Sequence, residues 1–310
     1  MFQGMDYIYE VYKEMSFSKA AKNLYISQPS LSAAVKKAEA QIGFPIFDRS
    51  TTPIRLTELG REYIRSVELI RDVENGFRNY VSDVNGLKNG SLSVGGTHLF
   101  ASYVLPSLIS QFTEQYPQLR FELVEATTAE LTEKLFSGSL DLFMDNKYMD
   151  PEVYEKRFFC KEHLLLVVPA SFESNGSVKN YAMTASDIKL NLHLNSHIPP
   201  VPLDVFRNDP FIMLRPGNDT RMRAESICRK YHFTPRIKLE SSQQITAYNL
   251  AKYGMGISFN GDLLVKYVQE SDKLLFYKLG NQDAIRDVNI YYKRSRYMTR
   301  AISEFLKLIQ

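Results

Sequence analysis

The stretch that decides the fold lies near the amino terminus: SFSKAAKNLYISQPSLSAAVKK, residues 16–37. Its first half predicts a short helix whose apolar face contains two alanines, and these small side chains let a second helix cross closely. That face consists of Phe17, Ala20, Ala21 and Leu24. The second helix begins after Ser27, whose hydroxyl can cap it, and has Pro29 in its first turn, where the missing N–H costs nothing. The spacing predicts a tight pair of helices.

The second helix has one apolar face and one small, polar and basic face. Its apolar side consists of Leu31, Val35, Ala38 and Ile42. The opposite face can enter the major groove of DNA, because short side chains permit close approach and hydroxyls reach base edges. The candidate base contacts are Gln28, Pro29, Ser30, Ser32 and Ala33, and the candidate phosphate contacts are Lys36 and Lys37. For a helix pair alone, a surface helix with solvated lysines is the commoner interpretation.

The residues that follow make a DNA-binding helix the better-supported interpretation. The segment DRSTTPIRLT, residues 48–57, predicts a short hairpin with two arginines, Arg49 and Arg55. It occupies the place where the wing of a winged helix-turn-helix touches phosphate or the minor groove. Ser18, on the first helix of the pair, is the remaining candidate DNA contact. Helix pair, second helix and wing together predict a DNA-binding domain.

A long helix is predicted from Glu58 to about Leu87, because this segment contains no proline and its apolar residues step by threes and fours. These residues are Tyr63, Val67, Ile70, Phe77, Val81 and Val84, arranged around Glu74. Such a seam is typical of a helix with a partner helix. Glu74 either fixes the register of that pair or points sideways to water.

The remaining chain alternates strands with helices, which predicts parallel α/β sheets in two lobes. Expected strands of the first lobe are 92–94, 119–123 and 140–144, with 163–169 following; those of the second are 211–214, 236–239 and 256–259. Strands at 274–279 and 288–292 and a helix at 297–308 are expected to complete the first lobe. The predicted domains are therefore 1–57 for DNA binding, 58–88 for the linker and dimerisation helix, and 89–310 for the two lobes. Lobe I spans about 89–166 and 266–310, and lobe II about 167–265.

Composition excludes several classes of protein. Hydrophobic residues make up 44 % and charged residues 24 %, which is typical of globular domains. No apolar run is long enough for a membrane helix and the start lacks an export signal, so we expect a cytoplasmic protein without membrane contact. The net charge is only +3, so DNA binding has to rest on local pattern.

These residues carry a resemblance to a known family. The runs FSKAAKNL (17–24) and SQPSLS (27–32), then Gly43, Phe47, Arg49 and LTELG (56–60), resemble the DNA-binding domain of LysR-type transcriptional regulators. Residues 95–106, GSLDL (138–142) and GMGI (254–257) are similar to the rest of that family. The resemblance implies an α plus α/β chain: an N-terminal winged helix-turn-helix, a long linker helix that dimerises, and a two-lobed, periplasmic-binding-protein-like effector domain.

The same resemblance implies how such a chain works. It predicts a regulator, not an enzyme, that binds an interrupted inverted repeat in a promoter, forms a homodimer through the linker helix and assembles as a tetramer. RNA polymerase is the further partner it suggests. A small-molecule effector is expected between the lobes, and no cofactor is expected.

The effector site follows from position, because ligands of α/β lobes bind outside the carboxyl ends of the strands, near helix N-termini. Hydroxyls and N–H groups there suit a small anion, although Thr and Asn at such places are also common helix caps. The candidate residues are Thr97, His98, Thr127, Thr128, Asn146, Asn218, Asp219, Thr220, Arg221, Ser242 and Gln243.

Four rival interpretations receive less support. Cys160 and Cys228 raise the possibility of a thiol-switch redox-sensing regulator, but buried, inert thiols fit two distant cysteines better. His193 and His197 are four residues apart without further ligands nearby, which favours a solvated loop over a metal site. A two-lobed small-molecule binding protein without regulatory DNA binding would need an export signal. An enzyme would need a paired acid and base or a nucleophile in the cleft.

Overall fold

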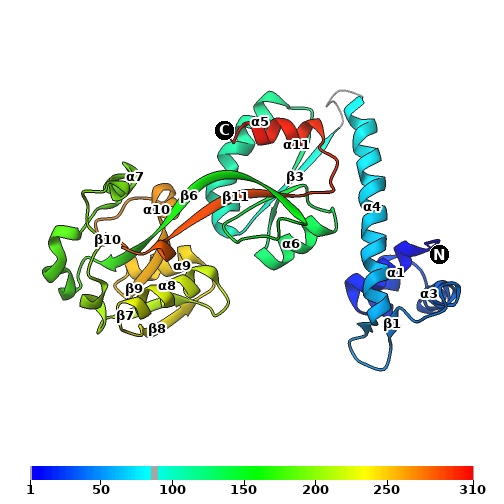
Figure 1. The fold of residues 1–310 in the computed structure, drawn as a ribbon, viewed down its shortest axis with the longest axis horizontal. Coiled ribbons are helices and arrows are strands. Elements are labelled where there is room, and N and C mark those ends of the chain that lie inside the picture. The colour runs from blue at the N-terminus through cyan, green and yellow to red at the C-terminus, as the bar shows by residue number, and fades with distance from the viewer. Residues whose placement is uncertain (1, 85–89, 310) are drawn as a thin grey trace. The chain divides into compact units, whose positions relative to one another are not determined.

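The chain forms two compact units in a computed structural model that describes residues 2–84 and 90–309 (Figure 1). The end of the predicted linker helix, residues 85–88, lies outside the described residues. Within the described ranges, no helix combines the length and the apolar character needed to cross a membrane.

The amino-terminal unit is a bundle of short helices with a small hairpin. It contains α1 (Met5–Glu14), α2 (Phe17–Asn23), α3 (Gln28–Ile42), β1 (Phe47–Asp48) and β2 (Arg55–Leu56). The two strands pair antiparallel and form the predicted wing. Ser27 caps α3 as predicted, since its Oγ accepts the Ser30 N–H at 3.2 Å. The predicted apolar residues Leu31, Val35 and Ala38 are buried in this unit's core, and Ile42 packs against it half-buried.

Helix α4 (Glu58–Val84) is the predicted long helix. The predicted apolar seam is wrong at its start, because Tyr63 and Val67 are buried in the core of the winged-helix unit instead of facing a partner. Phe77 and Val81 of the predicted seam remain uncovered together with Leu69 and Val73, and all four are at least 46 % exposed. Glu74 is exposed, as are the residues of this uncovered stripe.

The second unit is built on one continuous path of strands in the order β4-β3-β5-β11-β6-β9-β7-β8. The first lobe contains the parallel strands β3 (Ser91–Gly96), β4 (Arg120–Glu125) and β5 (Leu142–Asp145). The second lobe contains the parallel strands β7 (Pro210–Leu214), β8 (Arg236–Ser241) and β9 (Ile257–Gly261). The expected parallel sheets are confirmed.

Two antiparallel strands, β6 (Tyr154–Pro169) and β11 (Ile285–Lys293), connect the lobes, as Figure 1 shows. Strand β6 is much longer than the predicted run 163–169, because its amino-terminal half pairs with β11 and its carboxy-terminal half pairs with β9 and β10. The assignment of 274–279 to the first lobe is wrong. Strand β10 (Leu274–Lys278) pairs with the second-lobe half of β6, and Tyr277 packs there against Phe206.

Helices cover both faces of the first lobe. Helices α5 (Leu105–Gln115), which follows the π-helical turn η1 (Phe100–Val104), and α11 (Arg300–Lys307) pack on the face of Leu92 and Val94. Helix α6 (Thr128–Phe136) packs on the opposite face with Phe143. Gly95 permits this approach, since a Cβ there would lie 2.6 Å from Leu131 of α6.

The second lobe carries helices on its own sheet and several short 3-10 turns. Its helices are α7 (Ala185–Lys189), α8 (Asp219–Lys230), α9 (Gln244–Lys252) and α10 (Asp262–Tyr267), and its 3-10 turns are η2 (Glu173–Tyr181), η3 (Leu192–Leu194), η4 (Leu203–Phe206) and η5 (Gln282–Ala284).

Candidate DNA-contacting surface and inter-lobe pocket

The predicted DNA-contacting residues lie on the outside of the winged-helix unit. Of the ten candidates, all are exposed except Ser32, which is half-buried: Ser18, Gln28, Pro29, Ser30, Ser32, Ala33, Lys36, Lys37, Arg49 and Arg55. Ser18 Oγ lies 3.5 Å from Gln28 Oε1, which joins the first helix of the pair to the start of α3. This face of α3 is small, polar and basic, as a helix that enters the major groove requires.

The wing is held to α3 by Glu39, a residue that sequence reasoning did not single out. One carboxylate oxygen of Glu39 accepts the N–H groups of Ile46 (2.9 Å) and Phe47 (3.3 Å), and the other accepts Arg49 Nη2 (2.9 Å). Arg49 also lies 4.6 Å above the Phe17 ring and reaches Ser32 Oγ at 3.4 Å. Arg49 is thus part of the joint between wing and helix, whereas Arg55 and the two lysines point to solvent without such partners in the described chain.

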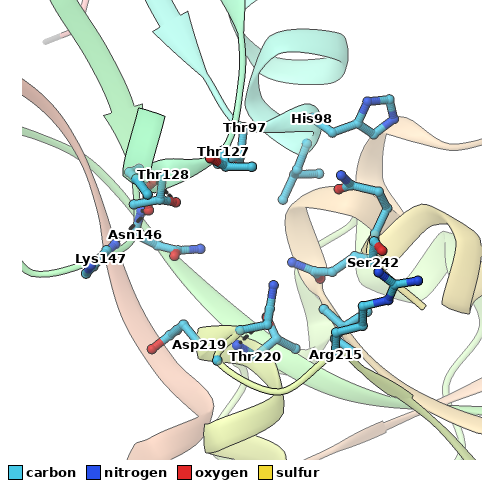
Figure 2. A pocket seen from close by; sticks show the side chains of 18 of the residues that line it. Thr97, His98, Thr127, Thr128, Asn146, Lys147, Arg215, Asp219, Thr220 and Ser242 are labelled. Carbon is cyan, nitrogen blue, oxygen red and sulfur yellow. Dashed lines mark hydrogen bonds between the residues drawn. The ribbon is translucent and has the colours of Figure 1, made fainter. Parts of the chain in front are cut away.

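A pocket of about 710 Å³ lies between the lobes at the carboxyl ends of their parallel strands. Figure 2 shows Thr97, Thr127 and Thr128 of the first lobe facing Arg215, Asp219, Thr220 and Ser242 of the second. Ten of the eleven predicted effector residues line it: Thr97, His98, Thr127, Thr128, Asn146, Asn218, Asp219, Thr220, Ser242 and Gln243. The rule that ligands bind at strand ends therefore selected residues from five separate segments, and the fold places them around one pocket.

Arg221 is the exception, and its prediction as a lining residue is wrong. Its guanidinium turns away from the pocket to Glu225 (2.7 Å), Glu240 and the carbonyl of Leu214 (2.9 Å). Its Nε and Nη1 bind two carboxylates and a carbonyl, so this cation is already paired outside the pocket.

Several of the lining residues cap helices. Thr127 forms a reciprocal cap on α6, since its Oγ1 and N–H both donate to Glu130 and its Oγ1 accepts the Glu130 N–H. Asn218 Oδ1 accepts the Thr220 N–H at 2.9 Å at the start of α8. In contrast, the hydroxyl of Thr97 forms no hydrogen bond within the described residues. The exposed Ser242 hydroxyl likewise has no partner among the described residues, so Thr97 and Ser242 are the candidate hydroxyls that are free to bind a ligand.

The pocket also contains two cations that sequence reasoning missed, Lys147 and Arg215 (Figure 2). Both side chains are exposed, and neither forms an ion pair within the described ranges. Lys147 follows β5 by two residues and Arg215 follows β7 directly, so both lie in loops from which the strand-end rule had selected only Asn146 and the residues 218–221. They give the pocket two unpaired positive charges.

A buried ion network closes the pocket at the strands that join the lobes. Arg286 of β11 donates from Nε to Glu162 of β6 (2.6 Å) and from Nη1 to Asp219 (2.7 Å) and Thr220 (3.0 Å). Burial disfavours the charge of Arg286, but the carboxylates of Glu162 and Asp219 outweigh it and raise the pKa of Arg286. This arginine therefore stays charged and ties the first turn of α8 to the connecting strands.

Asp145, at the end of β5, lies beside this network. Its carboxylate accepts the hydroxyl of Thr128 at 2.7 Å and the N–H groups of Asn146 and Lys147. Burial nevertheless raises the pKa of Asp145, because these hydrogen bonds compensate only part of the desolvation.

The two cysteines are half-buried or buried. Cys228 is fully buried in α8 and Cys160 is half-buried in β6. Burial raises the pKa of both thiols to about 12, so almost no thiolate is present at neutral pH. The structure gives no support to a thiol switch at either residue.

The interpretation of His193 as part of a solvated loop is wrong. His193 is 1 % exposed, and its Nε2 lies 2.9 Å from Asp262 Oδ2. Its neighbours are His163 and Asp262, residues 30 or more positions away, and not the exposed His197. The local spacing of the two histidines could not indicate this.

Fold and site together define the class of protein: a winged-helix DNA-binding unit joined to a two-lobed unit with a ligand pocket. Family models agree over most of the chain. Residues 2–61 match the model "Bacterial regulatory helix-turn-helix protein, lysR family", and residues 85–310 match "LysR substrate binding domain". The chain belongs to the LysR family. It is a DNA-binding transcription regulator with an effector-binding domain, and this family consists of regulators, not enzymes.

Individual relatives show the same organisation over the whole length. The uncharacterized HTH-type transcriptional regulator YcgK of Bacillus subtilis (strain 168) is 28 % identical, with 98 % of this chain and 92 % of the relative covered. Among solved structures, a full-length OxyR variant from Pseudomonas aeruginosa superposes with a TM-score of 0.69 at 22 % identity, covering 98 % of this chain and 92 % of that one. Full-length CbnR complexed with target DNA superposes with a TM-score of 0.59 at 17 % identity, with complete coverage of both chains. At these identities the structures support the fold alone.

Proposed function

We propose that this regulator reads DNA with the exposed face of α3 and holds the duplex with a few cations. The observation that carries the proposal is the composition of that face, where small or polar side chains and two lysines lie outside the core: Gln28, Pro29, Ser30, Ser32, Ala33, Lys36 and Lys37. Gln28, Pro29, Ser30, Ser32 and Ala33 face base edges, and Ser18 supports the start of the helix. Lys36, Lys37, Arg49 and Arg55 contact phosphates.

Salt dependence of DNA binding tests this division of roles. Each lost phosphate contact lowers the slope of log affinity against log salt by about 0.9. Lys36→Ala and Arg55→Ala are therefore expected to weaken binding to the promoter region beside the protein's own gene and to lower the slope by about one unit each. Lys179→Ala, which removes an exposed lysine of the second lobe, is the control for net charge. Unchanged affinity and slope in both test variants would refute the assignment.

The arrangement of subunits follows from α4. Its uncovered apolar stripe, Leu69, Val73, Phe77 and Val81, suits a second copy of the same helix and so a homodimer. Two wings then lie on successive turns of an interrupted inverted repeat in a promoter. Two such dimers form the tetramer, RNA polymerase is the protein partner at the promoter, and the protein acts in the cytoplasm, where the chromosome lies.

The effector we propose is a small anion bound in the inter-lobe pocket. Three features support an anion: the unpaired charges of Lys147 and Arg215, the free hydroxyl of Thr97, and the amino-terminal ends of α6, α8 and α9 at the pocket. An effector changes DNA binding only through unequal affinity for two arrangements of the lobes.

A calorimetric screen of anionic metabolites against the full-length protein tests the pocket. For a compound that binds, Arg215→Gln and Thr97→Val are expected to weaken binding, by about tenfold for the charge and somewhat less for the hydroxyl. Arg207→Gln removes an exposed arginine of the second lobe outside the pocket and is the matched control. Full affinity in both pocket variants would exclude this site.

A further inference from the structure

A cluster of two histidines and an aspartate lies outside the lining of the effector pocket, at the place where β6 passes from one lobe to the other. His163 is paired with Ile285 of β11, and the next residue of β6 is paired with Gly261 of β9. His193 comes from η3 and Asp262 begins α10. Within residues 2–84 and 90–309, this is the one group of three or more metal-ligating side chains whose donor atoms all lie within 4.8 Å of one another.

The donor atoms of the three side chains lie within 4.8 Å of one another. His193 Nε2 is 2.9 Å from Asp262 Oδ2, and His163 Nδ1 is 3.9 Å from the same oxygen. A tetrahedral zinc ion with bonds of about 2.0–2.1 Å holds neighbouring ligand atoms roughly 3.3 Å apart. The two nitrogen-to-carboxylate distances, 2.9 and 3.9 Å, lie on either side of this separation, and all donor atoms lie within 4.8 Å of one another, so movement of the His163 imidazole toward Asp262 and His193 completes the geometry.

The cluster also contains two buried imidazole nitrogens without a hydrogen-bond partner among the described residues, His163 Nδ1 and His193 Nδ1. This situation is rare and costs free energy in a folded protein. Asp262 is buried too, yet its Oδ1 is already fixed by the backbone N–H of His163 at 2.9 Å. The carboxylate is thereby oriented with Oδ2 toward both imidazoles.

We propose that His163, His193 and Asp262 bind one divalent transition-metal ion of the zinc type, with water as the fourth ligand. Two imidazoles and a carboxylate are a common donor set for such ions, and three protein ligands leave one position open. The imidazole of His163 is 24 % exposed, which gives the ion and the water a route from solvent.

Lys266 competes with the ion for the same oxygen. Its Nζ donates to Asp262 Oδ2 at 2.8 Å, so it supplies the positive charge when no metal is bound. The Lys266 side chain is 25 % exposed and lies one helical turn along α10, so it can turn to solvent when the ion enters. Removal of this ammonium is therefore expected to strengthen metal binding.

The test is metal binding by the tag-free, full-length protein. Co²⁺ is titrated and followed by its visible ligand-field absorption, and the affinity for Zn²⁺ is measured by competition with a chromophoric chelator. The expected result is one ion per chain with the intense absorption of a tetrahedral site. His163→Gln is expected to weaken binding by at least about tenfold, and Lys266→Gln is expected to strengthen it. The exposed His197 provides the control, because His197→Gln leaves the cluster intact.

Two further readouts keep the outcome unambiguous. Since His163 is partly exposed, His163→Gln is expected to fold, and an unchanged circular dichroism spectrum verifies this; His193→Gln, at a fully buried position, is used only as a supporting variant. A thiolate charge-transfer band with Co²⁺ would assign the ion to a cysteine site instead. That band, absence of stoichiometric binding, or equal binding by His163→Gln and the wild type would overturn the proposal.

Discussion

Removal of the Arg286 side chain is expected to destabilise the effector unit strongly. The change Arg286→Met keeps most of the apolar stem but removes a guanidinium that is 2 % exposed. Glu162 is fully buried and then keeps only the amide of Asn146, at 3.2 Å, as a side-chain partner. Removal of one member of a buried ion pair costs about 3–5 kcal/mol, because the remaining charge stays out of water without compensation.

Asp219 contributes less to this cost. It is 31 % exposed and retains Arg223 at 2.8 Å, so solvent and a second cation compensate its charge. The magnitude is therefore set by Glu162. In a domain of this size, a loss of 1 kcal/mol in the free energy of unfolding lowers the midpoint of thermal unfolding by about 2–4 °C. The midpoint should therefore fall by roughly 10 °C.

Calorimetric unfolding of the full-length protein measures this fall, and a double variant identifies its cause. If the uncompensated charge of Glu162 is responsible, Arg286→Met combined with Glu162→Met should recover most of the lost stability, since an apolar pair replaces the ionic one. Arg207→Met is the control at an exposed arginine. A decrease below about 3 °C in the single variant, or no recovery in the double variant, would refute the reasoning.

Other parts of the chain give predictions of their own. Glu39→Ala should weaken DNA binding about tenfold with little change in salt slope, because it frees the wing without removing a phosphate contact; a wild-type affinity would contradict this. Phe77→Glu places a charge in the uncovered stripe of α4 and should shift the sedimentation profile toward monomer, and an unchanged profile would discredit the dimer surface. With thiol pKa values of about 12, Cys160 and Cys228 should react with iodoacetamide far more slowly than free cysteine at pH 8, and fast labelling of the folded protein would revive a thiol switch.

Local patterns in the sequence predicted the winged-helix unit well because its determinants are local. The cap at Ser27, the apolar spacing of α3 and the short wing all depend on residues that are neighbours in sequence or one helical turn apart. The prediction of an apolar seam on α4 was wrong at the residues whose burial depends on other elements of the fold. Tyr63 and Val67 follow the spacing of a coiled coil, but the preceding helices already cover them, and sequence spacing does not say which neighbour covers an apolar face.

The extent of β6 and the lobe of β10 were not predictable for a similar reason. Strand β6 has 16 residues and changes partners halfway, so its two halves have different burial patterns. The half from Tyr154 to Lys161 is more exposed, and its sequence therefore lacks the apolar run that predicts a strand. The pairing of β10 with residues more than 100 positions earlier depends on long-range contacts that alternation of apolar residues cannot reveal. The same holds for His163, His193 and Asp262, whose proximity depends on three separate elements.

The inter-lobe pocket shows that the position of a residue after a strand predicts which segments form the site, but not which side chain is free to bind a ligand. Arg215 and Arg221 are both arginines beside the junction of β7 and α8, and each could be expected to bind a ligand. Glu225, one turn along the helix, and Glu240, on the neighbouring strand β8, bind Arg221 and turn it away. No carboxylate within the described residues engages Arg215, which stays in the pocket. Position thus predicts which segments form the site, but acidic residues elsewhere decide which of the two arginines is free to bind a ligand, and the Arg215→Gln measurement depends on that distinction.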